Sequence, residues 1–356
     1  MRVPVKKVLI AGAVGTASAG ILAAAGVTLA AAAVWKKLAM ADMFGKVVLI
    51  TGGSRGLGFA IAQEFAALGS RLVICARDAE ELQRAETELR RAGADVLTVV
   101  CDVSQQDEVQ NLVRRATERF GPIDVLVNNA GIISVGPIES QTIDDFREAL
   151  DVMFWGQVHT VLAVLPEMQR RQRGWIANIT SIGGKISVPH LLPYSCAKFA
   201  AVGLSEGLSA ELAKDGIHVT TVAPGLMRTG SHLNAYFKGD HRAEFAWFSI
   251  GAANPLFSIG AHRAARSIVR AIRRGQAELI LSVPAKIAVA AHGLFPGTTT
   301  RVLGLSNRII PGTGDTGKER FRGSESESAV SRSVLTKPGR RAAGEFLQNP
   351  PAQDAS

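Results

Sequence analysis

Cysteine is scarce in this chain of 356 residues, which contains only Cys75, Cys101 and Cys196. Three scattered thiols are too few for a disulfide framework or a tetrahedral zinc site, so the sequence excludes a small disulfide-stapled scaffold and predicts no metal. Unpaired thiols also fit a reducing compartment. With 47% apolar and 20% charged residues, the chain can bury a large core, and its length suggests one large domain with appendages.

A recognisable nucleic-acid-binding element is also lacking, although Lys and Arg number 40 against 31 Asp and Glu. We therefore expect no nucleic acid partner. Most of the basic excess is local, because residues 258–310 hold eight basic residues and a single acid, Glu278. A helix expected over 261–274 carries five of these arginines and would suit either solvent or the anionic headgroups of a membrane.

Residues 8–35 lack charge altogether, whereas Lys6 and Lys7 precede them and Lys36 and Lys37 follow them. As a helix, this run would reach about 42 Å, more than the roughly 30 Å hydrocarbon core of a bilayer. The run also exceeds the apolar region of about 7–15 residues that is usual in a signal peptide. The sequence predicts an uncleaved, single membrane-anchor helix within residues 1–40. A cleaved signal peptide and a soluble Ala-rich helix remain as alternatives.

Seven short and almost continuously apolar runs alternate with amphipathic stretches between residues 46 and 283. Such runs are typical of strands buried on both faces of a parallel sheet. The expected strands are 46–51, 71–75, 96–101, 123–127, 175–180, 217–222 and 278–283. The alternation predicts an α/β fold, a doubly wound parallel sheet of the Rossmann type, in a single catalytic domain over residues 41–283.

Two segments follow this domain. Residues 284–311 are largely apolar with a few basic residues, which predicts an amphipathic extension able to face a membrane. From Gly312 onward the composition shifts to Gly, Ser, Arg and Glu, without an apolar period. The sequence therefore predicts that residues 312–356 form a mostly disordered tail.

Glycines are concentrated where the first expected strand ends, in the run TGGSRGLG. Such glycines let the backbone approach a diphosphate, and the helix that follows offers free N–H groups to an anion. The cofactor contacts expected in this turn are Thr51, Gly52, Ser54, Arg55, Gly56, Leu57 and Gly58.

A carboxylate is missing at the end of the second strand, where an NAD site places one on the ribose hydroxyls. Ala76 stands there instead, followed by Arg77, and Arg55 lies inside the glycine turn. Two guanidiniums can bracket a 2′-phosphate, so NADP(H) is the expected cofactor and NAD(H) is less favoured.

Three polar residues follow the fifth expected strand: Ser181, Tyr194 and Lys198. Tyr194 and Lys198 are four residues apart and share one helix face. The ammonium is expected to lower the pKa of the phenol, and Ser181 can hydrogen-bond a substrate oxygen. Together they offer what carbonyl reduction needs, a proton for the developing alkoxide while hydride leaves a nicotinamide.

The order and spacing of these motifs resemble those of the short-chain dehydrogenase/reductase superfamily over residues 46–283. The match rests on TGGSRGLG, CDV at 101–103, NNAG at 128–131, Ser-x12-Tyr-x3-Lys and PG at 224–225. The resemblance implies that Tyr194 is the proton donor, Lys198 its modulator and a ribose ligand, and Ser181 the partner of the substrate oxygen. It also implies cofactor contacts from Asp102, Val103, Asn129, Ala130, Gly131, Tyr194, Lys198, Pro224, Gly225 and Thr229.

The resemblance further implies an NADP(H)-dependent oxidoreductase that interconverts a ketone or aldehyde and an alcohol. Aromatic residues between Gly225 and Phe257 suggest a lipophilic substrate, with an aromatic cluster that only packs the lid over the site as the alternative. The alternatives are a non-catalytic NADP-binding scaffold or sensor, and an epimerase or dehydratase on the same fold. Family members commonly pair through the helices that correspond to 143–172 and 195–214, so we expect a homodimer or homotetramer, with its catalytic domain cytoplasmic.

One residue departs from the family pattern. Met153 stands where the family commonly has an asparagine before the fifth strand. A thioether cannot hold a proton-relay water as an amide does. We therefore expect proton exchange between Lys198 and solvent to be slower or rerouted, with the Ser–Tyr–Lys group still able to act.

Overall fold

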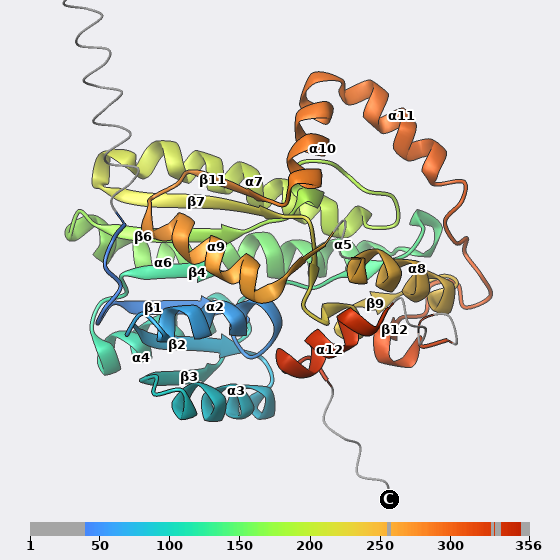
Figure 1. Ribbon diagram of the computed structural model, residues 1–356. Helices are drawn as coiled ribbons and strands as arrows, with labels where there is room; N and C mark the ends of the chain where they lie inside the picture. Colours follow the sequence, from blue (N-terminus) through green and yellow to red (C-terminus); the bar gives the residue numbers. More distant parts are fainter. Residues whose placement is uncertain (1–39, 255–257, 329–330, 332–335, 350–356) are drawn as a thin grey trace, which may run out of the picture. The chain divides into compact units, whose positions relative to one another are not determined.

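Seven parallel strands form the central sheet of the unit that begins at Met43 (Figure 1). This computed structural model describes residues 40–254, 258–328, 331 and 336–349, so the predicted membrane anchor lies outside the described residues. The order across the sheet is β11-β7-β6-β4-β1-β2-β3. These strands are β1 (Val47–Thr51), β2 (Arg71–Ala76), β3 (Val96–Val100), β4 (Val125–Asn128), β6 (Gly174–Ile179), β7 (Ile217–Pro224) and β11 (Glu278–Leu281).

The central strands are buried on both faces, which is why their sequences are almost continuously apolar. Every residue of β1 and β6 is buried, and every pairing within this sheet is parallel. Each predicted strand agrees with the observed one to within two residues at both ends. The predicted doubly wound fold and its seven strands are therefore confirmed.

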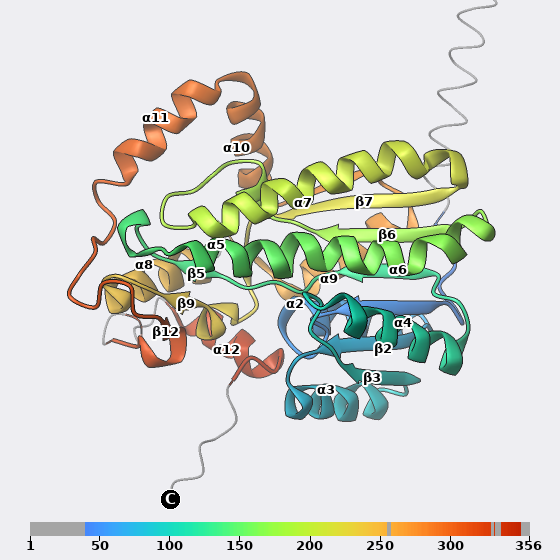
Figure 2. The ribbon, with the colours of Figure 1, turned by 180° about the vertical axis from the view of Figure 1, so that it is seen from behind.

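Helices cover the two faces of the sheet. One face carries α2 (Gly56–Ala66) and α9 (Ala261–Arg273), which pack on each other (Figure 1). The other carries α4 (Gln106–Phe120), α6 (Gly156–Arg170) and α7 (Leu192–Glu211), as Figure 2 shows. The helix α3 (Ala79–Arg91) packs along β2 and β3.

The helix expected over 143–172 is not regular. It consists of α5 (Ile143–Leu150), a π-helical turn (Asp151–Trp155) and α6. The stretch Ile143–Arg170 is long and apolar enough to cross a membrane by length and composition. However, it packs against α4, α7 and the sheet, as a core helix does. Met153 lies in the π-helical turn and is fully buried.

The chain reverses direction across the sheet after β3. It returns past β1 to form β4, so β1 lies between β2 and β4. At such a switch point the connections leave the carboxyl ends of neighbouring strands on opposite sides, which opens a crevice there. The fold therefore places the glycine turn after β1 and the segment after β4 beside one another.

A smaller layer lies beyond these carboxyl ends. It contains the sheet β12-β9-β5, from Phe321–Arg322, Tyr236–Phe237 and Ser134–Val135, the pair β8 (Leu226–Arg228) and β10 (Ser258–Gly260), and α8 (His241–Ala253). Phe237, Phe245 and Phe248 pack together in its core. These aromatic residues, expected to contact substrate, instead hold this layer together.

The prediction of a disordered tail is wrong for the described part of residues 312–356. β12 pairs with β9, and α12 (Lys337–Glu345) packs on α8 and β8. Gly339, Ala342, Ala343 and Phe346 are buried at helical spacing. Because three of these four side chains are no larger than a methyl group, their periodicity was too weak to stand out in a Gly- and Arg-rich sequence.

The predicted extension over 284–311 forms two helices, α10 (Val283–Leu294) and α11 (Pro296–Ser306). They pack on each other and α10 contacts β11. Of their residues only Ala285 is buried. Their large apolar side chains are therefore mostly exposed.

Candidate active site

A cavity of about 540 Å³ opens at the carboxyl ends of the central strands. Open α/β sheets bind their ligands at this switch point. Thr51, Gly56 and Gly58 of the predicted set are not among the lining residues. The other predicted residues all line the cavity, namely Gly52, Ser54, Arg55, Leu57, Arg77, Asp102, Val103, Asn129, Ala130, Gly131, Ser181, Tyr194, Lys198, Pro224, Gly225 and Thr229.

Thr51 and Asn129 tie the glycine turn to the end of β4. The Thr51 hydroxyl oxygen accepts hydrogen bonds from the backbone N–H groups of Asn129 and Ala130, each at 3.0 Å. In return, the Asn129 amide donates to the carbonyls of Thr51 and Gly52. A Cβ on Gly58 would lie 2.1 Å from the Gly52 carbonyl oxygen, so only glycine permits this close turn. These residues thus shape the cradle and need not touch its ligand.

The helix α2 begins at Gly56, directly behind this cradle. The helix has no side-chain cap and no acidic residue in its first turn. Its first intrahelical donor in this turn is Phe59, whose N–H bonds to the Arg55 carbonyl. Leu57 lines the cavity. Apart from the Gly56 N–H, which donates to the Phe346 carbonyl at 2.8 Å, this N-terminus has no side-chain cap, and a helix N-terminus behind a glycine turn fits the diphosphate of a dinucleotide.

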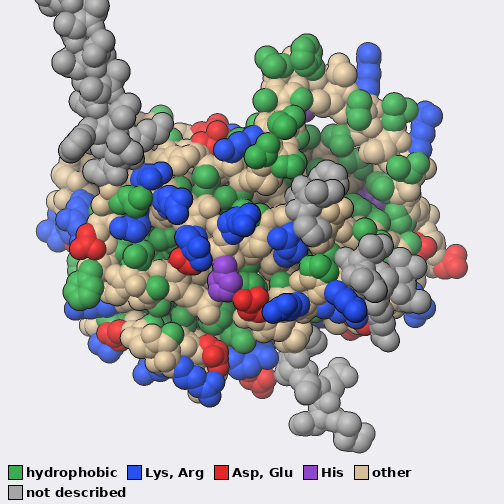
Figure 3. Space-filling model, in the orientation of Figure 1, with side chains coloured by type: hydrophobic (Ala, Val, Ile, Leu, Met, Phe, Trp, Pro, Cys, Tyr) green, Lys and Arg blue, Asp and Glu red, His purple; other side chains and the backbone are tan. Residues whose placement is uncertain are grey.

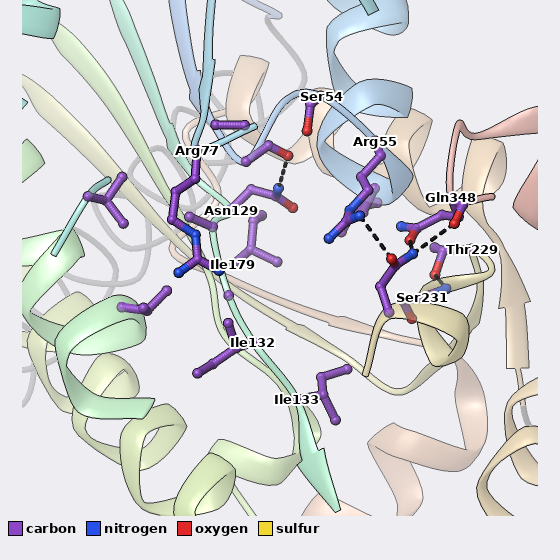
Figure 4. Close-up of a pocket in the computed structure, with 18 of the residues that line it drawn as sticks. Ser54, Arg55, Arg77, Asn129, Ile132, Ile133, Ile179, Thr229, Ser231 and Gln348 are labelled. Carbon is purple, nitrogen blue, oxygen red and sulfur yellow. Dashed lines mark hydrogen bonds between the residues drawn. The ribbon is translucent and has the colours of Figure 1, made fainter. Parts of the chain in front are cut away.

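Two guanidiniums extend into the cavity, from Arg55 in the glycine turn and from Arg77 after β2 (Figure 4). Arg77 is half exposed, and its Nη1 lies 3.9 Å from a carboxylate oxygen of Asp102. Arg55 is already engaged, since its Nη1 donates to Glu81 at 2.5 Å and to Asn234 at 2.9 Å. Burial lowers the pKa of Arg55, and the Glu81 carboxylate opposes that shift. Both arginines are placed where they fit a 2′-phosphate. Arg55 would then bind the phosphate and the Glu81 carboxylate at the same time.

Asp102 is one of the residues for which the resemblance implies a cofactor contact. Its carboxylate accepts hydrogen bonds from the backbone N–H and the hydroxyl of Ser104, at 2.9 and 2.8 Å. The side chain therefore stabilises the turn before α4 and lines the cavity from that position.

Ser181, Tyr194 and Lys198 meet where β6 ends and α7 begins. Pro193 occupies the first turn of α7, where its fixed φ suits a helix start, and places Tyr194 next to the cavity. The Tyr194 phenol is hydrogen-bonded to Ser181. The Lys198 ammonium donates to the Ile179 carbonyl at 2.8 Å and lies 5.7 Å from the centre of the Tyr194 ring. The three predicted catalytic residues are thus brought together.

The pKa of Tyr194 shifts in the direction opposite to the one predicted from the sequence. Burial raises the pKa of Tyr194, and the hydrogen bond with Ser181 opposes this only in part. Burial lowers the pKa of Lys198 to about 8. The Lys198 ammonium donates to a backbone carbonyl. Its charge therefore does not offset the cost of burying the Tyr194 phenolate, and that cost raises the pKa of Tyr194. Tyr194 is therefore protonated at neutral pH, which is the state that a proton donor requires.

Met153 borders this group from the π-helical turn. A Cβ built on Gly131 would lie 3.5 Å from the Met153 sulfur and 3.8 Å from the Lys198 Nζ. The thioether and the ammonium therefore both lie near Gly131. A thioether is only a weak acceptor, and the expected change in proton exchange stays a prediction.

Several lining residues could not be singled out from the sequence. Glu81, Asn234, Arg322 and Gln348 all line the cavity and come from α3, the segment before β9, β12 and the C-terminal segment. No motif marks them, because each reaches the site through the tertiary fold. Gln348 comes from the segment that was predicted to be disordered.

The comparisons with known proteins agree with this geometry. A family model described as short chain dehydrogenase matches residues 46–236, just over half of the chain. A dehydrogenase/reductase SDR family protein 7-like from Anopheles gambiae is 36% identical over 244 residues, covering 67% of this chain and 75% of that protein. The dehydrogenase/reductase SDR family member 7B from Bos taurus is 31% identical over 264 residues, covering 72% and 80%.

A solved structure of an actinorhodin polyketide ketoreductase variant with NADPH is similar at a TM-score of 0.61 and 32% identity. The similarity covers 97% of that chain and 68% of this one. That structure contains NADPH. From its fold, its motifs and these matches, the chain belongs to the short-chain dehydrogenase/reductase family.

Proposed function

We propose that the chain is an NADP(H)-dependent oxidoreductase that interconverts a ketone or aldehyde and an alcohol on a lipophilic substrate. The observation that carries this proposal is one cavity with Ser181, Tyr194 and Lys198 in one part of its lining and Arg55 and Arg77 in another. A non-catalytic scaffold would not need a protonated phenol beside a buried ammonium.

The residues support a simple division of work. Bound NADPH would supply the hydride. Ser181 and Tyr194 would hydrogen-bond the substrate oxygen, and Tyr194 would give it a proton as negative charge develops. Lys198, held at the Ile179 carbonyl, would stabilise the phenolate that this transfer leaves behind. Thr229, Pro224 and Gly225 line the cavity and would border the nicotinamide.

Apolar side chains support a lipophilic substrate. Ile132, Ile133, Val152 and Met227 line the same cavity as the catalytic group. Within a lining that is otherwise rich in polar residues, these four side chains offer an apolar surface for the carbon skeleton of a hydrophobic ketone. NADPH-dependent reduction of a panel of such ketones by the full-length chain tests this function, and we expect NADPH to be consumed with at least one of them.

Exposed apolar residues on the long helices support a homodimer or homotetramer. Trp155, Leu162 and Phe199 are large, exposed and located on the segments from Ile143 to Arg170 and from Leu192 to Glu211. Burial of these side chains against a second copy would remove them from water. The free thiols Cys75, Cys101 and Cys196 support a cytoplasmic catalytic domain.

The α10–α11 pair supports a membrane contact in addition to the proposed anchor in residues 8–35. Hydrophobic side chains gather over this pair (Figure 3). Leu294 and Phe295 at its turn are 73% and 63% exposed, and Ile309 after it is 86% exposed. No acidic residue occurs between Glu278 and Asp315, whereas Lys286, Arg301 and Arg308 are basic. An exposed apolar turn with basic flanks suits an anionic bilayer.

A fluorescent label at this turn tests the contact. In the full-length chain with Cys196→Ser, an environment-sensitive dye on Phe295→Cys should shift to the blue with phosphatidylserine vesicles. The shift should be smaller with phosphatidylcholine alone, because the basic residues add about 1 kcal/mol each on an anionic surface. The same dye on Ile143→Cys, an exposed position on α5, is the matched control. Equal emission from both positions would contradict the contact, even if the chain binds vesicles through residues 8–35.

A further inference from the structure

The last described segment, residues 336–349, is fixed against the domain. Phe346 is 2% exposed, and its ring lies 4.8 Å from that of His262 at the start of α9. Ala343 is fully buried and packs so closely on Gly230 that a Cβ there would lie 2.5 Å from the Ala343 Cβ. These anchors hold the residues that follow α12 in a defined place.

That place is the glycine turn. The backbone N–H of Gly56 donates to the Phe346 carbonyl at 2.8 Å. A Cβ on Gly56 would lie 2.2 Å from the Gln348 Nε2, so the missing side chain makes room for Gln348. Leu57, the next residue, faces the cavity, and Gln348 lines the same cavity. The segment therefore contacts the glycine turn at Gly56 and contributes Gln348 to the cavity lining.

Gln348 also sets the orientation of Asn234. The Asn234 Nδ2 donates to both the backbone carbonyl and the Oε1 of Gln348, at 2.8 and 2.7 Å. The Asn234 Oδ1 is then left to accept from the Arg55 Nη1 at 2.9 Å (Figure 4). Both acceptor oxygens of Gln348 bind the side-chain nitrogen of Asn234. The side-chain oxygen of Asn234 is therefore the atom that faces Arg55.

Arg55 is thereby held from two sides. Glu81 binds it from α3, and Asn234 binds it from the segment before β9. Without Asn234 in this orientation, the guanidinium would retain only the carboxylate of Glu81. A planar guanidinium that is fixed in advance loses less freedom when it binds a phosphate, so its position contributes to affinity.

We propose that the C-terminal segment forms one wall of the cofactor site and that Gln348, through Asn234, positions Arg55 for the 2′-phosphate of NADP(H). Gln348 and Asn234 are thus positioning residues for cofactor choice. The inference rests on the proposed function, since it assumes that Arg55 grips this phosphate.

Gln348→Ala tests the inference in the full-length chain. We expect the Kd for NADPH to rise about 3- to 10-fold, because the variant loses the Gln348 Oε1 bond to Asn234 while the backbone carbonyl of residue 348 still accepts from Asn234. The Kd for NADH should stay within a factor of about two, because NADH lacks the phosphate that Arg55 grips. The unfolding temperature should fall by no more than about 4 °C, since one hydrogen bond of a buried side chain is lost. Asn349→Ala, an exposed neighbour on the same segment, is the matched control and should behave as wild type.

A double-mutant cycle separates positioning from simple loss of packing. If Gln348 acts through Asn234, then Asn234→Ala with Gln348→Ala should weaken NADPH no more than Asn234→Ala alone. Additive losses, or equal weakening of NADPH and NADH, would overturn the inference. Unchanged NADPH binding by Gln348→Ala would also overturn it. A wild-type chain that binds no NADPH would instead overturn the proposed function itself.

Discussion

Replacing Tyr194 by phenylalanine should lower kcat for ketone reduction about 10²–10⁴-fold, the usual contribution of a positioned proton donor. The phenol is hydrogen-bonded to Ser181, and burial raises its pKa, so it is the group that holds a proton at neutral pH. Phenylalanine keeps the ring and the fold but has no proton to give. Steady-state kinetics with NADPH and a hydrophobic ketone measure the effect.

The control is the only other tyrosine of the chain, Tyr236 in β9. Tyr236→Phe removes the same atom from another wall of the same cavity, near Arg55, and should retain kcat to within about threefold because Tyr236 does not belong to the Ser181–Tyr194–Lys198 group. Tyr194→Phe should still bind NADPH with unchanged affinity. Wild-type turnover by Tyr194→Phe would contradict the role of Tyr194 as proton donor.

The second large effect concerns the choice of cofactor. Arg55→Ala combined with Arg77→Ala should raise KM for NADPH about 100-fold, since each lost charged hydrogen bond is worth about 1.5–3 kcal/mol and losses overlap. KM for NADH should change little, because NADH has no 2′-phosphate. Initial rates with both cofactors give the ratio directly.

Arg91→Ala is the matched control for this pair, since Arg91 is exposed at the far end of α3 and pairs only with Glu88 among the described residues. It should leave both KM values unchanged. A double variant that loses NADPH and NADH equally would show that the two arginines support the site in general and do not select NADP(H).

The sheet and the motif residues were predictable from the sequence for a physical reason. Strands such as Val47–Thr51 and Gly174–Ile179 are buried on both faces, so their apolar runs are uninterrupted. The turn after β1 and the Tyr194–Lys198 pair depend only on local spacing, which a sequence displays directly.

Other parts of the site depend on contacts between distant segments. The bonds of Arg55 to Glu81 and Asn234 join residues 26 and 179 positions apart, and Asn234 meets Gln348 a further 114 positions on. The pKa of Tyr194 depends on burial, which its spacing from Lys198 does not show. α12 was missed because its buried face consists largely of glycine and alanine.

In the proposed reaction, NADPH bound in this cavity reduces the carbonyl group of a ketone to an alcohol. The most direct test is to incubate the purified full-length chain with NADPH and each of a panel of hydrophobic ketones, following cofactor absorbance and alcohol product together. We expect at least one ketone to consume NADPH and to yield one alcohol for each NADPH oxidised. A folded chain that consumes no NADPH with any ketone, or that rearranges a substrate without net change in NADPH, would contradict it.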